Sequence, residues 1–226
     1  MRLEVLFATR SRESSFQDLG EEPLQLLGGD GPWEVEIGFG KGRYLLESAA
    51  ASPEKRFLGI EVVSKYYRLC RRRAVNRGLD NLMVARGEAL YMLSAMLPQA
   101  FASRLHVYFP DPWPKARHHK RRLFDPETVD LVLGLLRPGG ELCFATDFLE
   151  YGESVVDILQ DFPGLEVQRH EGPWPDGART NYEAKYMREG RPVLRLRARL
   201  QPTPEPLHPD GKNGIVIGPR APQPDA

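Results

Sequence analysis

From Trp33 onward, apolar runs of strand length alternate with amphipathic runs of helix length, and this alternation limits the folds open to the chain. Strands are expected at 33–37, 56–60, 82–85, 105–109 and 141–146. Helices are expected at 43–51, 63–77, 89–97, 125–136 and 149–160. Strands that alternate with helices form βαβ units, whose strands are parallel and whose crossovers are right-handed. The pattern therefore predicts an α/β fold with a mostly parallel, doubly wound sheet.

Two further strands are expected at 165–169 and 193–200, with no helical crossover between them. They would close the sheet as an antiparallel β-hairpin. Residues 1–31 show no sustained periodicity and end in a glycine-rich cluster, so we interpret them as a variable N-terminal arm. Residues 201–226 contain too much proline and too few apolar residues to pack, which predicts a disordered tail.

Composition excludes several classes of protein. A chain of 226 residues has the length of one ordinary domain. Its formal net charge is +0, so any attraction to nucleic acid must come from local patches. Cys70 and Cys143 are far apart and form no CxxC motif, which indicates reduced thiols and no zinc or other metal site. No signal peptide and no apolar stretch of bilayer length is visible, so a cytoplasmic protein without membrane attachment is expected.

A glycine loop at 36–42, Glu-Ile-Gly-Phe-Gly-Lys-Gly, follows the first strand and opens a helix, which is typical of a nucleotide-type site. Gly38 and Gly40 would let the backbone approach a ligand closely. The third glycine comes one residue too early for a dinucleotide fingerprint. Glu36 lies directly under the loop, where it would repel a pyrophosphate and favour a ligand with a cationic group.

Acidic residues also follow the next two strands. Glu61 is placed to accept hydrogen bonds from two ribose hydroxyls, and Glu88 to hold an adenine edge or the loop backbone. A cofactor with a ribose, an adenine and a cationic head but no phosphate is S-adenosylmethionine. The alternative is that these are ordinary surface carboxylates at strand ends.

A proline loop at 109–115, Phe-Pro-Asp-Pro-Trp-Pro-Lys, follows the fourth strand. Its prolines fix their own φ angles and restrict the residues before them, which holds Asp111 and Trp113 on a stiff turn. Ligands of open α/β sheets bind at the carboxyl ends of the strands, which is where this loop is expected. A cationic run continues from the loop: Arg117, His118, His119, Lys120, Arg121 and Arg122. An acid, an aromatic ring and cations together could bind a nucleobase and its phosphates. The alternative is a plain surface loop before a solvated charged segment.

Five motifs together resemble the bacterial tRNA (guanine-N7)-methyltransferase family: EIGFGKG, GIE ending at Glu61, FPDPWPKARHHKRR, ATD ending at Asp147, and TNYEAKY. They stand in the family's order and span about 33–200, and the PDPWPK-R-H-KRR block followed by TNYE is the most specific part. The resemblance implies a Rossmann-like class I methyltransferase domain at 32–200. It implies S-adenosylmethionine as cofactor, tRNA as partner, and 7-methylguanosine in the variable region as product.

The resemblance also implies roles for individual residues. The cofactor acids fall on Glu36, Glu61 and Glu88, with Asp111 both completing that site and acting in catalysis. The residues expected to bind the substrate are Lys115, Asp147, Thr180, Asn181, Tyr182 and Glu183, and those expected to bind RNA are 117–122. The family usually has aspartate where Glu88 stands, and neither end of the chain matches its pattern.

Methylation of guanine N7 needs no strong base, because N7 carries a free lone pair and no proton. Asp111 is the candidate for stabilising the cationic base that forms, although it could instead accept from guanine N1–H and N2–H, as could Asp147 or Glu183. Trp113 or Tyr182 could stack on the base. There are three rival hypotheses. The first is an amine methyltransferase, because Asp-Pro-Trp is similar to that class's tetrapeptide. The others are an NAD-dependent oxidoreductase and a non-catalytic RNA-binding protein.

Histidines and a second basic run have simpler interpretations. His106 lies in an apolar strand and is expected to be a hydrogen-bonded core residue, and the adjacent His118 and His119 diverge too much to share a metal. The helix at 63–77 carries five arginines: Arg68, Arg71, Arg72, Arg73 and Arg77. A solvated face is the favoured interpretation of this run, and RNA contact is the other.

Overall fold

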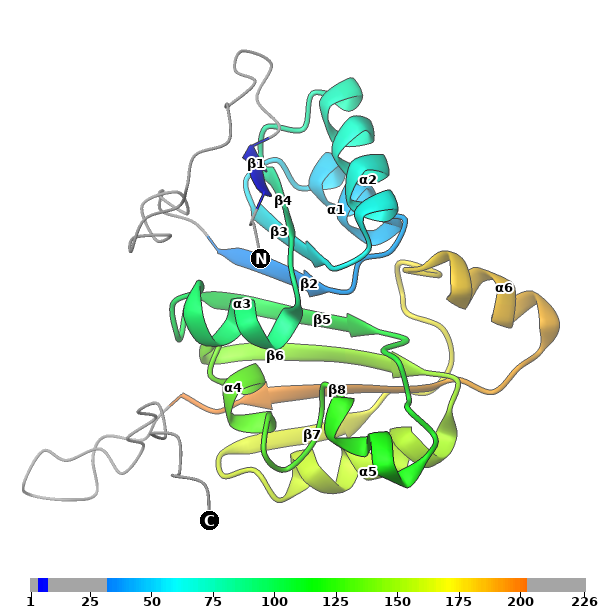
Figure 1. Cartoon of the computed structure of the whole chain (residues 1–226). Helices are drawn as coiled ribbons and strands as arrows, with labels where there is room; N and C mark the ends of the chain where they lie inside the picture. The colour runs from blue at the N-terminus through cyan, green and yellow to red at the C-terminus, as the bar shows by residue number, and fades with distance from the viewer. Residues whose placement is uncertain (1–3, 8–31, 203–226) are drawn as a thin grey trace, which may run out of the picture.

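The computed structural model describes residues 4–7 and 32–202, and the strands in these two ranges form one eight-stranded sheet (Figure 1). The strand order is β1-β4-β3-β2-β5-β6-β8-β7. The strands are β1 Glu4–Phe7, β2 Trp33–Ile37, β3 Arg56–Glu61, β4 Leu82–Arg86, β5 Ala102–Tyr108, β6 Leu136–Thr146, β7 Leu165–Arg169 and β8 Leu194–Leu200.

The central strands of this sheet are parallel. Strand β2 pairs in parallel with β3 and β5, while β3 pairs in parallel with β4, and β5 with β6. Strands β6, β8 and β7 follow in antiparallel order, and β1 is antiparallel to β4 at the other edge. The predicted mostly parallel sheet with antiparallel closing strands is confirmed.

Helices cover both faces, which confirms the doubly wound arrangement. Helices α1 Arg43–Ala51 and α2 Ser64–Arg77 pack on one face, and α3 Ala89–Ala95, α4 Val129–Leu133 and α5 Leu149–Gln160 on the other. Strand β2 shows why two cores form. Its Val35 and Ile37 belong to the core under α3, α4 and α5, so the alternate residues Glu34 and Glu36 face α1.

The helix predicted at 125–136 is wrong in length, and the strand after it starts earlier than expected. Helix α4 covers only Val129–Leu133, and β6 begins at Leu136. The Pro-Gly-Gly cluster at 138–140, expected to end the helix, lies inside β6. There the pairing with β5 jumps from Ala102↔Leu136 to Arg104↔Glu141, so the extra residues form an irregularity in the strand.

The segment between β7 and β8 was expected to lack a helix, which is also wrong, since it contains α6 Asn181–Glu189. Thr180 caps this helix by accepting a hydrogen bond from Glu183 N–H, and Gly190 ends it with a φ of 64°. The pattern Thr-x-x-Glu is a capping box, so the signal for a helix was present in the sequence. Helix α6 lies beyond the ends to which the arrows of β2 and β5 point (Figure 1).

The ends of the chain are described only in part. Within the region interpreted as a variable arm, residues 4–7 form β1 and extend the sheet beyond β4. The proline-rich tail beyond residue 202 lies outside the described residues. No helix within 4–7 and 32–202 is long and apolar enough to cross a membrane.

Candidate active site

The loops at the carboxyl ends of the parallel strands bring the predicted acids to one edge of the sheet. Glu36 and Glu61 lie at the ends of β2 and β3, and Glu88 follows β4. Asp111 and Asp147 follow β5 and β6, on the other side of β2. Because carboxyl ends of parallel strands share an edge, five acids distant in sequence lie along one edge of the sheet, where ligands of such sheets bind.

The glycine loop between β2 and α1 has the backbone that its glycines allow. Gly38, Gly40 and Gly42 have φ angles of 74°, 53° and 71°, a region that other residues rarely adopt. A Cβ at Gly38 or Gly40 would meet no protein atom within 4 Å, so both face space open to a ligand. A Cβ at Gly42 would lie 2.3 Å from Cys70 Sγ, so this glycine serves the packing of α1 on α2.

Glu61 shapes that loop. One of its carboxylate oxygens accepts from Gly40 N–H at 2.8 Å and the other from Val63 N–H at 2.8 Å. A carboxylate oxygen has more than one acceptor position, so these bonds leave room for the ribose hydroxyls expected there. Glu61 therefore links the glycine loop to the start of α2.

We expect Glu61→Ala to weaken S-adenosylmethionine binding at least tenfold, because the N–H groups of Gly40 in the glycine loop and of Val63 before α2 lose their acceptor. Calorimetric titration measures the affinity. Glu61→Gln retains one acceptor oxygen and should fall between the wild type and the alanine variant. Wild-type affinity in Glu61→Ala would contradict a role for this carboxylate in the loop.

Glu36 is a buried carboxylate with unused hydrogen-bonding capacity. The side chain is 2% exposed, and one of its oxygens has no hydrogen-bond partner among the described residues. Burial first, and the neighbouring Glu61 carboxylate second, raise the pKa of Glu36 to about 8. A buried acid with a free acceptor oxygen suits the positively charged methionine portion of S-adenosylmethionine.

Glu88 lies at the outer end of the row of acids. It caps α3, where its carboxylate accepts from Leu90 N–H at 3.2 Å and Tyr91 N–H at 2.8 Å, and its side chain is exposed. Of the two roles considered for this residue, the structure shows the contact with the backbone.

The proline loop is held in a strained conformation. Phe109 and Trp113 have φ angles of 53° and 39°, which are rare for residues other than glycine and cluster at functional sites. Asp111 lies between them and is exposed. Arg122 holds the loop by donating from Nε to Pro112 O at 2.8 Å.

The cationic run divides into two groups. Residues 116–121 form a 3₁₀ helix in which Arg117, Lys120 and Arg121 are exposed, and His118 and His119 are half-buried. The Arg121 guanidinium lies 5.0 Å from the centre of the Trp113 ring. The sequence predicted that Arg122 contacts RNA. In the structure it is 7% exposed and lies over the Tyr151 ring, so it supports the loop from inside the protein.

An aromatic cluster joins the proline loop to α6. The centre of the Phe109 ring lies 5.5 Å from that of Tyr186 and 6.4 Å from that of Tyr182. Tyr182 is 58% exposed. Partial burial, and then the Asp147 carboxylate that the Tyr186 hydroxyl contacts, raise the pKa of Tyr186. Tyr182 and Asp147, which are separated in sequence by helix α5 and strand β7, thus both lie beside Tyr186.

Glu183 and Thr180 have internal partners. Glu183 is fully buried, and its two oxygens accept from Arg179 N–H at 2.8 Å and Arg195 Nε at 2.7 Å. Thr180 caps α6. In this structure the two residues position α6, while Asn181 and Tyr182 on its first turn are exposed.

Arg179 is a residue that sequence reasoning missed. It is buried, donates to the Tyr108 hydroxyl at 2.6 Å, and stacks on Trp174 with its guanidinium 4.3 Å from the ring centre. Its charge opposes the rise in the pKa of Glu36. Nothing in the sequence around Arg179 distinguishes it from a surface arginine, since its partners come from β5 and the preceding turn.

His106 is a hydrogen-bonded core histidine, as predicted. One ring nitrogen lies 2.8 Å from the Tyr44 hydroxyl and 3.1 Å from Glu34, and the other lies 2.8 Å from the Tyr108 hydroxyl. Burial lowers the pKa of His106 to about 4, which keeps it neutral. No group of three or more His, Cys, Asp or Glu residues in the described part of the chain could hold a metal ion.

Two solved structures share this fold. The aminoglycoside resistance methyltransferase NpmB1 superimposes with a TM-score of 0.55 at 20% identity, over 84% of this chain and 97% of that one. A variant of the 16S rRNA (adenine(1408)-N(1))-methyltransferase from Catenulisporales acidiphilia, solved with S-adenosylmethionine, gives 0.56 at 19% identity, over 91% and 100%. Both structures show that this chain has a Rossmann-like methyltransferase fold.

Sequence relatives are more specific. The family model described as "Putative methyltransferase" matches residues 30–196. The tRNA (guanine-N(7)-)-methyltransferase of Nitrosococcus oceani is 39% identical over 80% of this chain and 78% of its own length. That of Halorhodospira halophila is 39% identical over 78% of each chain. The chain therefore belongs to the tRNA (guanine-N(7)-)-methyltransferase family.

Proposed function

We propose that the chain transfers the methyl group of S-adenosylmethionine to N7 of a guanine in the variable region of tRNA. The observation that carries this proposal is the meeting of the strained Asp111 loop, the exposed Tyr182 ring and the cationic 3₁₀ helix at the edge that holds Glu36. Because tRNA is a cytoplasmic substrate, we place the reaction in the cytoplasm.

When bound, S-adenosylmethionine supplies an electrophilic methyl group on a positively charged sulfur. Glu36 and Glu61 would hold the cofactor, the first by its charge and the second through the ribose and the glycine loop. Guanine N7 attacks without losing a proton, so the protein's task is alignment and stabilisation of the positive ring that forms. A carboxylate on a preorganised turn can provide that stabilisation, and we assign this role to Asp111.

Recognition of guanine is assigned to the aromatic cluster and Asp147. Tyr182 offers a stacking face to a base turned out of the RNA, a contact worth about 1–3 kcal/mol. Asp147, oriented by the Tyr186 hydroxyl, can accept from N1–H and N2–H, a donor pair that adenine lacks. Lys115 and the exposed cations after it would bind phosphates, which positions the RNA without specifying its sequence.

Arg121→Ala is expected to weaken binding of all RNAs similarly and to reduce the log–log salt slope of the affinity by about one. Binding titrations at four or more salt concentrations measure the slope. Arg121→Lys keeps the charge but loses the planar contact with Trp113, so its slope should match that of the wild type. An unchanged slope in Arg121→Ala would show that this residue binds no phosphate.

The function is tested by incubating the purified protein with methyl-labelled S-adenosylmethionine and unmodified tRNA, followed by digestion to nucleosides. Label is expected in 7-methylguanosine. A tRNA carrying 7-deazaguanine at the target position lacks N7 and should accept no label, although every other group of the base is present. Label in an N2- or N6-methylated nucleoside would instead establish the amine methyltransferase.

A further inference from the structure

Helix α2 carries a concentrated positive charge that the proposed reaction does not use. Its fourteen residues contain six cations, Lys65, Arg68, Arg71, Arg72, Arg73 and Arg77, and no acid. The whole chain has 31 basic and 31 acidic residues, so α2 departs sharply from the chain's overall balance. A local concentration of one sign on a neutral protein is the pattern of a binding surface for the opposite charge.

The buried side of α2 determines where these cations point. Tyr67, Cys70 and Ala74 face the sheet and are buried. Residues Lys65, Arg68 and Arg72 follow one another at spacings of three and four on the opposite side, and all three are exposed. We call these three residues the α2 basic face.

This arrangement lowers the stability of the helix. Arg68 and Arg72 are like charges at i, i+4, a pairing that costs a few tenths of a kcal/mol, and Lys65 lies in the first turn, where the helix dipole disfavours a cation. No acid occupies that turn. Within the described residues, none of the three cations of the face forms an ion pair with an acid. The three cations are therefore present although they lower the stability of the helix.

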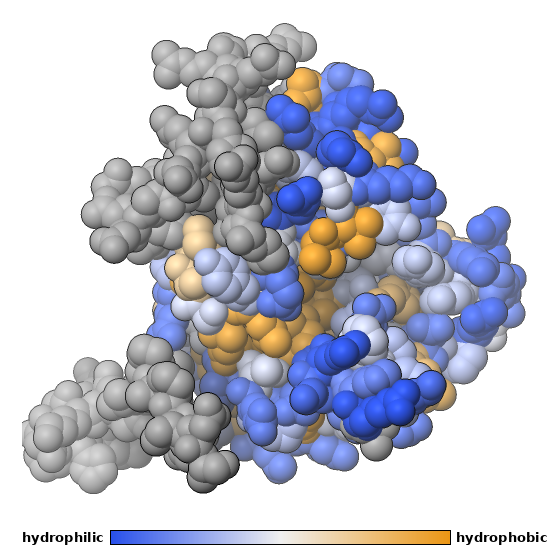
Figure 2. Space-filling model, viewed as in Figure 1, coloured by the Kyte–Doolittle hydropathy of each residue, from blue (hydrophilic) through white to orange (hydrophobic). Residues whose placement is uncertain are grey.

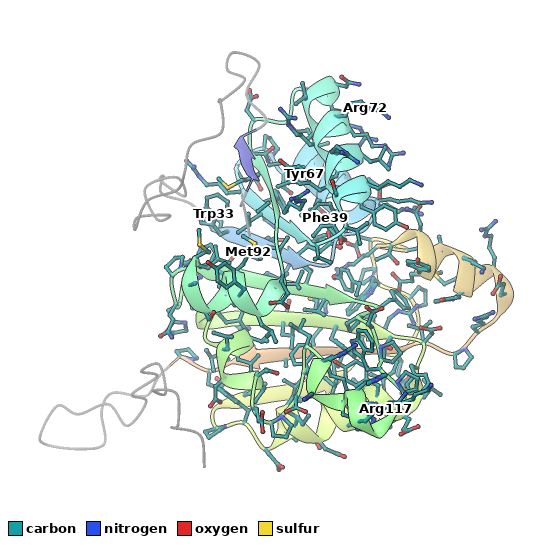
Figure 3. All side chains as sticks on the ribbon, in the orientation of Figure 1. Trp33, Phe39, Tyr67, Arg72, Met92 and Arg117 are labelled. Carbon is teal, nitrogen blue, oxygen red and sulfur yellow. The ribbon has the colours of Figure 1, made fainter. Side chains whose placement is uncertain are left out.

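The α2 basic face is attached rigidly to the cofactor site. Glu61 accepts from the N–H of Val63 just before α2, and Arg73 donates to the carbonyl of Lys41 in the glycine loop at 3.2 Å. Figure 3 places Arg72 and Arg117 on opposite sides of the molecule, with Phe39 of the glycine loop between them. Figure 2 shows a predominantly hydrophilic surface over α2. Two basic surfaces thus lie on either side of the site.

We propose that the α2 basic face is a second contact surface for the phosphate backbone of the tRNA, on the far side of the site from the 3₁₀ helix. The inference rests on the proposed function for the identity of the RNA. A folded tRNA whose guanine enters the site extends past it on both sides, so its phosphates reach α2 while those next to the guanine reach Arg117, Lys120 and Arg121. A short hairpin that carries only the target guanine would reach the 3₁₀ helix alone.

The test compares two RNAs with the double variant Arg68→Ala/Arg72→Ala. For full-length tRNA, the dissociation constant at low salt should rise about tenfold and the log–log salt slope should fall by about two, close to one for each lost charge. For a hairpin of the variable region, the dissociation constant should change less than twofold. The kcat at saturating tRNA should stay at the wild-type value, because the face lies away from the reacting atoms.

Two variants serve as controls. Arg68→Lys/Arg72→Lys retains both charges and should restore the affinity for full-length tRNA. Arg137→Ala removes an exposed charge from the start of β6, at the amino ends of the parallel strands and so away from the site. It should change the affinity for neither RNA. Each variant is compared with the wild type by melting temperature, so that loss of folding is recognised.

The outcomes separate the two proposals. Unchanged affinity for full-length tRNA in the double alanine variant, or an equal loss for both RNAs, would overturn the role of the α2 basic face. If the wild-type protein binds tRNA but forms no 7-methylguanosine, the proposed function fails. The α2 basic face would in that case still be supported by a selective loss of full-length tRNA binding.

Discussion

Asp111→Ala is expected to lower kcat about 10²- to 10³-fold, because the variant removes the negative charge that we propose to stabilise the guanine ring as that ring becomes positive. The affinity for tRNA should change much less, since the exposed cations and the aromatic cluster remain. The prolines and the Arg122 contact with Pro112 hold the loop in place without the Asp111 side chain. Single-turnover methylation at saturating S-adenosylmethionine and tRNA measures the effect.

Asp111→Asn distinguishes two ways in which this residue could act. The amide keeps an acceptor oxygen but has no charge. If Asp111 stabilises charge, the asparagine variant should be about as slow as the alanine variant. If it only orients guanine by accepting a hydrogen bond, asparagine should restore most of the rate. Activity equal to the wild type in both variants would remove Asp111 from the mechanism.

Glu36→Gln is expected to stabilise the cofactor-free protein at high pH and to weaken cofactor binding there. Burial, followed by the Glu61 carboxylate, raises the pKa of Glu36 to about 8, from 4.5 in an ordinary glutamate. Between these two pH values the folded protein holds a proton that the unfolded chain has released. Stability therefore falls as pH rises from about 4.5 to 8, and the full loss, several kcal/mol, is present above pH 8.

Glutamine imitates the protonated carboxyl group, so the variant should escape this loss. The melting temperatures of the two proteins should be similar at about pH 4.5, should diverge as the pH rises, and should differ by at least about 5 °C at pH 9, with that of Glu36→Gln the higher. Cofactor affinity should show the reverse pattern. In the wild type it should rise with pH up to about 8, as Glu36 ionises, while in Glu36→Gln it should stay low and nearly flat. Parallel pH profiles in the two proteins would show that Glu36 does not titrate in this range.

Much of the fold follows from local patterns. The run of Val35 and Ile37 predicted β2, and Gly78 marked the end of α2, because these signals depend on neighbours within a few residues. The error at 125–136 arose where tertiary pairing overrides such signals, whereas α6 was missed although its capping signal is local. The Pro-Gly-Gly cluster is a stop signal by itself, yet its position beside β5 places it inside a strand.

The site shows the same division between local and tertiary information. The positions of Glu36, Glu61 and Asp111 at one edge of the sheet could be predicted, because each lies at or just past the end of a strand that is visible in the sequence. The partners of Glu183 could not be predicted, since Arg195 comes from β8 and Arg179 from the turn before α6. The burial of Arg122 likewise depends on Tyr151 of α5, which the cationic run does not reveal.

The three tryptophans occupy different surroundings, and this gives the protein an internal optical probe. Trp33 and Trp174 are buried, whereas Trp113 is partly exposed on the proline loop, with Arg121 over its ring. A base or phosphate arriving at this loop changes the environment of Trp113 and leaves the other two indoles as they were. The change in intrinsic emission on adding tRNA should therefore come from a single residue, which allows arrival of the RNA to be timed in the unlabelled protein.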